Sequence, residues 1–76
     1  MVVEISKTKN NLYDVRLEQY KCGKLCENAE DIKNYIYKQM SNYTEDKIDI
    51  FIDKNINDNE YKEIIKVYKG EKAWVV

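Results

Sequence analysis

The chain has 76 residues, 14 acidic against 13 basic side chains, a net charge of −1 and no histidine. A chain of this length forms one domain, so residues 1–76 are expected to fold as a single domain. The balanced charge argues against a nucleic-acid partner and against a polybasic membrane anchor. The N-terminus lacks the pattern of a secretory signal, and no apolar stretch approaches the roughly 20 residues that span a bilayer, so we expect a cytoplasmic protein without a membrane span.

Lys, Asn, Ile and Tyr fill almost half of the chain. This bias is typical of A/T-rich genomes, as in low-G+C bacteria and many viruses. It says more about the source of the chain than about its function.

Two segments near the start alternate apolar and polar residues. Residues 2–7 and 12–21 follow the period of a half-buried strand, and residues 8–11 supply the turn between them, so they predict a β-hairpin. In the second segment, the core-facing positions are Tyr13, Val15 and Leu17. The opposite face is expected to carry Asp14, Arg16, Glu18 and Tyr20.

Residues 22–27 are expected to form a loop that bends at Gly23 and contains Cys22 and Cys26. Three residues separate the two cysteines, a spacing that matches neither a redox dithiol nor half of a usual zinc site. Ordinary reduced thiols are the favoured interpretation. A disulfide that closes the loop, and a zinc site shared between two copies of the chain, are the alternatives.

The next pattern predicts a helix that is capped by Asn28 and ends near Ser41. Its apolar stripe recurs at three- and four-residue intervals. The members of this stripe are Ala29, Ile32, Tyr35, Ile36, Met40 and Tyr43.

Residues 47–53 predict a third strand, and a second helix opens after it. The strand places Ile48, Ile50 and Ile52 on one face and Asp49, Phe51 and Asp53 on the other. Asn57 and Glu60 have the spacing of a capping box, and Gly70 suits a left-handed helix end. The apolar stripe of this helix is Tyr61, Ile64, Ile65 and Tyr68. Residues 73–76 then predict a short final strand.

These elements predict an α+β fold, a two-layer sandwich of order ββαβαβ. Its four-stranded mixed sheet would carry two helices on one face and leave the other face open. Large apolar groups inside a polar rim are typical of interaction surfaces. The partner-binding residues predicted on and beside this face are Phe51, Trp74, Arg16, Tyr20, Asp49 and Asp53. The alternative is that Trp74 completes the core at the sheet edge and that charged stems shield Phe51.

Residues 45–63 are acidic, with seven acids against three lysines. The acids are spread over a strand and a helix start without the glycine of a calcium loop, so no metal site is expected. Asp49 and Asp53 would lie roughly 13 Å apart along a strand, too far for a glycosidase pair. The serines and threonines have no histidine to activate them, and no phosphate loop exists. The sequence therefore predicts a non-enzyme without a cofactor.

The segment from Asn28 to Val76 resembles the periplasmic domain of the biopolymer-transport proteins ExbD and TolR. The resemblance lies in a capped helix, a hydrophobic strand that ends in Asp53 and Lys54, a short loop with Glu60 and Tyr61, and a second helix. The membrane helix of that family has no counterpart among these residues. The resemblance implies a non-enzymatic domain that dimerises or grips a partner through its sheet.

The leading functional hypothesis is a small protein-interaction module that uses an open sheet face or an edge strand. The first alternative is a phage or mobile-element inhibitor of a host defence protein that acts through an acidic surface. The second is a thiol-dependent switch at Cys22 and Cys26. Unpaired edge strands also allow a homodimer.

Overall fold

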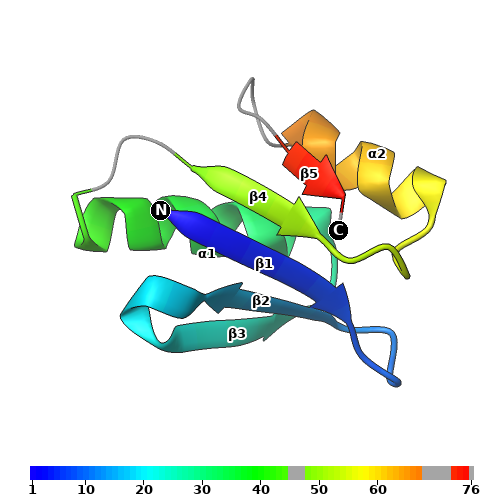
Figure 1. Ribbon diagram of the computed structural model, residues 1–76, viewed down its shortest axis with the longest axis horizontal. Helices are drawn as coiled ribbons and strands as arrows, with labels where there is room; N and C mark the ends of the chain where they lie inside the picture. The colour runs from blue at the N-terminus through cyan, green and yellow to red at the C-terminus, as the bar shows by residue number, and fades with distance from the viewer. Residues whose placement is uncertain (45–47, 68–72, 76) are drawn as a thin grey trace.

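The computed structural model describes residues 1–44, 48–67 and 73–75, with side chains for all of these except Asp58, Tyr61, 65–67 and 73–75. The elements are β1 (Val2–Lys7), β2 (Tyr13–Leu17), a 3-10 turn η1 (Glu18–Tyr20), β3 (Cys22–Cys26), α1 (Ala29–Asn42), β4 (Asp49–Ile52), α2 (Asp58–Val67) and β5 (Ala73–Val75). The strands form one mixed sheet in the order β3-β2-β1-β4-β5 (Figure 1). The predicted α+β class, with a mixed sheet and two helices, is confirmed.

The sheet has one strand more than the sequence predicts. Residues 22–26 form the strand β3, which pairs antiparallel with β2, where a loop was expected. The second predicted strand also ends earlier, because η1 follows Leu17 and Lys21 adopts a left-handed backbone with φ of 51°. Two hairpins therefore stand at the start of the chain, and β3 forms one edge of the described sheet.

The first hairpin forms where alternation predicts it. β1 and β2 pair antiparallel, with Glu4 opposite Arg16 and Ser6 opposite Asp14. In the turn, the Thr8 amide donates to the Leu12 carbonyl at 2.8 Å, and Asn11 takes a positive φ of 63°, which asparagine tolerates. This turn fixes the register and so decides which side chains reach each face.

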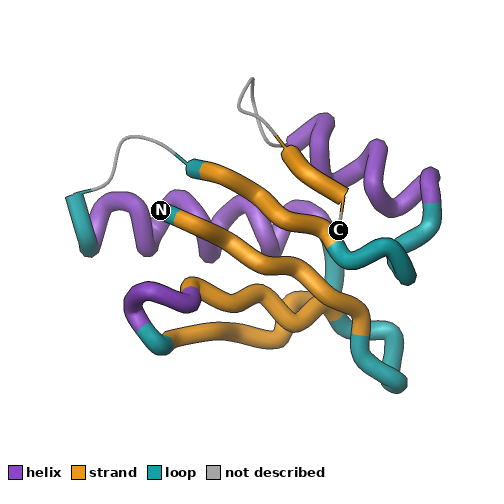
Figure 2. The backbone as a smooth tube through the Cα atoms, in the orientation of Figure 1, coloured by secondary structure: helices purple, strands orange, loops and turns teal. Residues whose placement is uncertain are grey.

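Both helices lie on the same side of the sheet (Figure 2). A single core joins the two layers and includes Val3 and Ile5 of β1, Ile50 of β4, Ile36 of α1 and Ile64 of α2, each no more than 1% exposed. The Asn28 side chain caps α1 as predicted and accepts from the Asp31 amide at 2.9 Å. The predicted stripe residues Tyr61, Ile65 and Tyr68 and the predicted helix end at Gly70 lie outside the described side chains.

The start of α2 is fixed by the predicted capping box and by an ion pair. The Glu60 amide donates to Asn57 Oδ1 at 2.9 Å, and Glu60 Oε1 accepts from the side-chain amide of Asn57 at 2.9 Å. The Lys7 ammonium at the end of β1 pairs with the same carboxylate, with side chains 23% and 19% exposed, and lies 5.5 Å from the centre of the Tyr13 ring. This contact ties the first hairpin to the second helix.

Candidate functional site

The face of the sheet that the helices leave uncovered is the candidate site. Because side chains alternate along each strand, the residues opposite the core positions share this face. From β1, β2 and β4 and the residue after β4, they are Val2, Glu4, Ser6, Asp14, Arg16, Asp49, Phe51 and Asp53. We call this set the open face. Phe51 is half-buried near its middle, where it lies opposite Glu4 in the parallel pairing of β1 with β4.

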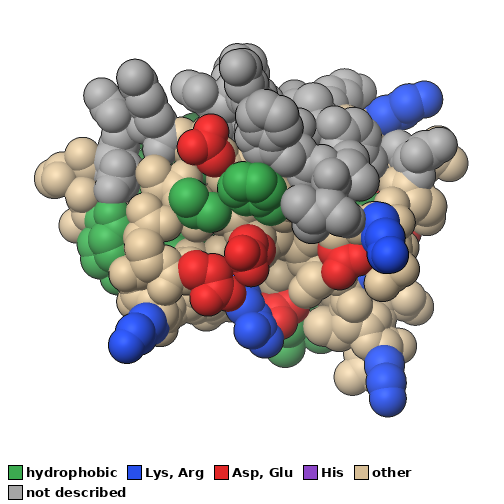
Figure 3. All heavy atoms as spheres, in the orientation of Figure 1, with side chains coloured by type: hydrophobic (Ala, Val, Ile, Leu, Met, Phe, Trp, Pro, Cys, Tyr) green, Lys and Arg blue, Asp and Glu red, His purple; other side chains and the backbone are tan. Residues whose placement is uncertain are grey.

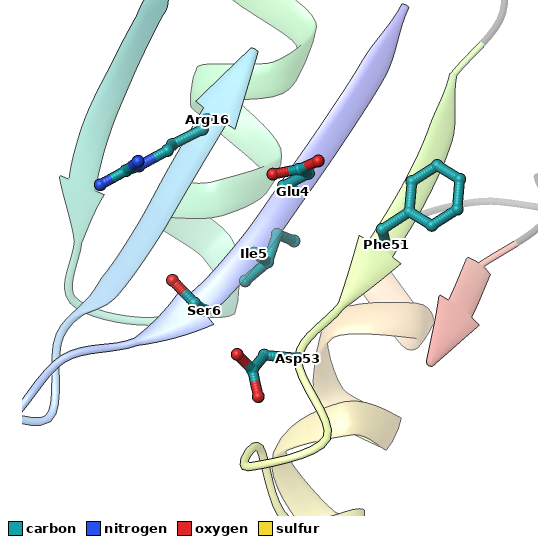
Figure 4. A pocket seen from close by; sticks show the side chains of 6 residues that line it. All are labelled: Glu4, Ile5, Ser6, Arg16, Phe51 and Asp53. Carbon is teal, nitrogen blue, oxygen red and sulfur yellow. The ribbon is translucent and has the colours of Figure 1, made fainter. Parts of the chain in front are cut away.

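A depression of about 420 Å³ lies on the open face between β1, β2 and β4. Its lining residues are Glu4, Ile5, Ser6, Arg16, Phe51 and Asp53. Figure 4 shows Asp53 directed from the end of β4 toward β1, where Glu4 and Ser6 lie. The depression therefore combines an aromatic ring, a hydroxyl group and two carboxylates.

The position of Asp53 is fixed by hydrogen bonds from its own neighbourhood. Its amide donates to the Ile5 carbonyl at 2.9 Å, which extends the pairing of β4 with β1 by one residue. Its Oδ1 accepts from the Asn55 amide at 2.8 Å, the Asx-turn contact that aspartate commonly makes. The carboxylate is thus held at the edge of the depression by the turn that ends β4.

Arg16 lines the depression, but its charged end is held elsewhere. Its Nε donates to Asp14 Oδ2 at 3.0 Å, and Nη2 lies 3.0 Å from the same oxygen. This hydrogen bond raises the pKa of the Arg16 guanidinium, which stays charged. Figure 4 shows the side chain extended toward β3, away from Glu4. The guanidinium is therefore hydrogen-bonded to Asp14, and the charge of Glu4, which lies opposite Arg16 on β1, also helps to raise the pKa of Arg16.

The open face is acidic as a whole. Its members carry four carboxylates, those of Glu4, Asp14, Asp49 and Asp53, against the single guanidinium of Arg16. Figure 3 shows acidic side chains gathered on this side of the molecule beside apolar ones. A local charge of −3 contrasts with −1 for the whole chain.

Five of the six predicted partner-binding residues fall on the open face or on the strand beside it. Phe51, Arg16, Asp49 and Asp53 lie where alternation places them. Trp74 lies opposite Phe51 in the backbone pairing of β4 with β5, and its side chain is outside the described residues.

The placement of Tyr20 on the open face is wrong. Tyr20 belongs to η1 rather than to β2, and it packs against the core with its ring stacked on that of Tyr43 at a centroid distance of 3.9 Å. The chain turns at residues 18–20, so the strand alternation that predicted its direction has ended before it. Glu18, expected on the same face, also lies in this turn.

Glu4, Ser6 and Leu25 are exposed or partly exposed residues of this surface that were not predicted from the sequence. Glu4 and Ser6 alternate with the buried Val3 and Ile5, so the pattern of β1 already contained this signal. Leu25 pairs with Asp14 across the β2–β3 ladder and is 55% exposed. With residues 22–27 predicted as a loop, no strand alternation in the sequence indicated that Leu25 lies on the surface of the sheet.

The two cysteines are not joined in this fold. Cys22 is partly buried, Cys26 is buried, and both are free thiols. They stand four residues apart on one extended strand, which separates their Cα atoms by roughly 13 Å, whereas a disulfide spans at most about 7 Å. The predicted alternative of a disulfide that closes a loop is therefore wrong for the folded chain. A thiol-dependent switch at this pair would first require β3 to unfold.

Cys22 instead lies beside two tyrosines, Tyr35 of α1 and Tyr43 just after the C-terminal end of this helix. Its Sγ lies 3.9 Å from the Tyr43 hydroxyl. Burial, followed by a hydrogen bond with Cys22, raises the pKa of Tyr35 to about 12. Burial also raises the pKa of the Cys26 thiol, which disfavours the reactive thiolate. Tyr35 and the two cysteines are therefore packed in or against the core, whereas Tyr43 is 37% exposed.

In the described part of the chain, no three histidine, cysteine, aspartate or glutamate residues come together to hold a metal ion. Neither described helix is long and apolar enough to cross a membrane. Comparison of the chain with protein-family models, with curated proteins and with solved structures finds no match.

Proposed function

We propose that the chain is a small non-catalytic interaction module that binds a partner protein through its open face. The observation that carries this proposal is the half-buried Phe51 beside a depression of about 420 Å³ on a sheet face that neither described helix covers. An aromatic group surrounded by polar side chains is the usual centre of a protein interface. The absence of histidine and of a phosphate loop from the sequence supports a role without catalysis.

We also propose that the protein acts in the cytoplasm. Two free cysteines in a chain of this size are in keeping with a reducing compartment, because small secreted domains usually join theirs. The resemblance to ExbD and TolR implies a domain that grips a partner through its sheet, and so it supports binding through the open face. It does not support a role in energy coupling.

The test compares Phe51→Ala with a matched control, Tyr37→Ala. Tyr37 is an aromatic residue of α1 that is 38% exposed, and α1 covers the opposite side of the sheet. Partners captured by immobilised wild-type protein should be lost with Phe51→Ala and retained with Tyr37→Ala, while circular dichroism shows both variants folded. Equal capture by both variants would refute the face assignment.

The partner can also be a second copy of the chain. Sedimentation velocity over a concentration range, with and without reductant, separates this case from a different protein. A dimer that Phe51→Ala dissociates would assign the open face to self-association. A dimer that resists Phe51→Ala would assign self-association to an edge strand such as β3.

The charge of the open face favours a second candidate function, an inhibitor of a basic protein. Carboxylates presented on a surface can occupy a site that binds nucleic acid, as a phage or mobile-element inhibitor of a host defence protein would do. Binding to a basic nuclease should then weaken steeply as salt rises from 50 to 500 mM, since such contacts are screened. Salt-independent binding would favour the first candidate, with Phe51 as its main contact.

A further inference from the structure

We propose that the partner of the open face is a basic protein segment that inserts an arginine side chain into the depression beside Phe51, between the carboxylates of Glu4 and Asp53. This inference rests on the proposed function and specifies the chemistry of the partner. It follows from the spacing of the two carboxylates, from the internal pairing of Arg16 and from the neighbouring aromatic ring.

The backbone positions of Glu4 and Asp53 suit a guanidinium held between their side chains. Asp53 follows β4 at the position opposite Ser6, so Glu4 and Asp53 are offset by one strand and by two residues along it. Strand spacing and rise place their Cα atoms roughly 8 Å apart. From this backbone spacing, the side chains of Glu4 and Asp53 can approach a planar guanidinium from its two sides and accept charge-assisted hydrogen bonds of about 2.8 Å.

The protein does not supply this cation itself within the described residues. No ion pair joins Glu4 or Asp53 to a basic side chain in residues 1–44 and 48–64. Arg16 is engaged by Asp14, and Lys7 is engaged by Glu60 at the start of α2. Arg16 lies opposite Glu4 and interacts with its charge, but no described basic side chain forms an ion pair with Glu4 or Asp53, so both carboxylates can still accept a cation from outside.

Arginine fits the depression better than the other cations. Its planar group carries a fork of N–H donors that can pair with two carboxylates, whereas a lysine ammonium is a compact, strongly hydrated charge. A divalent metal ion needs oxygens within about 2.6 Å of one point, which carboxylates on Cα atoms roughly 8 Å apart do not readily provide. The volume of about 420 Å³ lies in the range of sites that enclose a side chain or a small ligand.

The test uses three capped peptides that are identical except at one central position, which is arginine, lysine or citrulline. Citrulline keeps the shape of arginine and lacks its charge. Each peptide is titrated into the ¹⁵N-labelled full chain, and the backbone amide shifts are followed by NMR. The protein variants are Glu4→Gln, Asp53→Asn and, as a control in the first turn of α1, Glu30→Gln, whose side chain is 61% exposed.

The arginine peptide should shift the amides of Glu4, Ser6, Phe51 and Asp53, with affinity about tenfold higher than that of the citrulline peptide. The lysine peptide should bind more weakly than the arginine peptide. Glu4→Gln and Asp53→Asn should each weaken the arginine peptide severalfold, and Glu30→Gln should leave it unchanged. Equal affinity for arginine and citrulline, equal affinity for arginine and lysine, or shifts centred on the helix starts would each overturn the inference.

The same variants separate this inference from the proposed function. If Phe51→Ala abolishes capture of the natural partner while Glu4→Gln and Asp53→Asn do not, the open face binds a partner without an arginine anchor. If none of the three variants affects capture, both the inference and the face assignment fail.

Discussion

Glu60→Gln is expected to lower the free energy of unfolding by about 2 kcal/mol. The substitution keeps the shape of the side chain and its contact with Asn57, but it removes the charge that faces Lys7. An exposed ion pair contributes up to about 1 kcal/mol, and breaking a fully buried one costs about 3 to 5 kcal/mol. With the two side chains 23% and 19% exposed, this pair lies between these limits. The unpaired Lys7 ammonium, held at the end of β1, accounts for most of the expected loss.

Urea unfolding followed by far-UV circular dichroism measures this effect. The matched control is Glu30→Gln, the same substitution in the first turn of the other helix, where Lys33 lies 3.7 Å away and the Glu30 side chain is 61% exposed. The control should cost at most about 0.5 kcal/mol. Lys7→Met completes a double-mutant cycle, and the two substitutions should be strongly non-additive. A Glu60→Gln variant no less stable than Glu30→Gln would refute the role assigned to this pair.

Three further outcomes are expected. Because the pKa of Tyr35 is raised from 10 to about 12, its contribution to stability is fully present below pH 10 and is lost as pH rises through 12. In urea unfolding series at pH 8 to 12, Tyr35→Phe should remove up to about 2 kcal/mol of this loss. A pH profile that the substitution leaves unchanged would contradict the burial of the Tyr35 hydroxyl. Gly23→Ala should destabilise the fold by about 1 kcal/mol or more in urea unfolding, because the added Cβ would lie 2.9 Å from the Val15 carbonyl oxygen. As a control, Lys24→Ala at an exposed position should change the free energy of unfolding by no more than about 0.5 kcal/mol. Similar values for both variants would argue against the pairing of β2 with β3. The unfolding midpoint should be the same with and without reductant, since Cys22 and Cys26 are held apart on one strand, and a shift on reduction would show that they can meet.

The elements predicted best are those whose own sequence decides their structure. Alternation placed β1 at residues 2–7, and the caps at Asn28 and Asn57 placed the helix starts, because these signals act over a few neighbouring residues. One detail differs at the second cap, where Glu60 accepts from the side-chain amide of Asn57 rather than from its backbone. Local chemistry therefore sufficed for the helices and for most of the sheet.

The strand β3 could not be predicted in the same way. Residues 22–26 contain one glycine and one lysine, and Lys24 points to the same side as Cys22 and Cys26, so the apolar alternation is broken at its centre. What makes this segment a strand is its pairing with β2, a contact that alternation within the segment does not signal. The error at Tyr20 has the same origin, because the turn at residues 18–20 depends on Lys21 taking a positive φ that is unusual for lysine.

The acidic surface is also decided by pairing and not by the order of the chain. The acids at residues 45–63 form one run in the sequence, but the fold divides that run. Asp49 and Asp53 go to the open face, whereas Glu60 turns to Lys7 at the start of α2. Two further acids of the open face, Glu4 and Asp14, come from the first hairpin, which lies more than thirty residues before this run in the sequence. This charge pattern exists only when β1 has paired with β4, so binding through this face, as proposed, would depend on the folded sheet and not on the acidic segment as a linear motif.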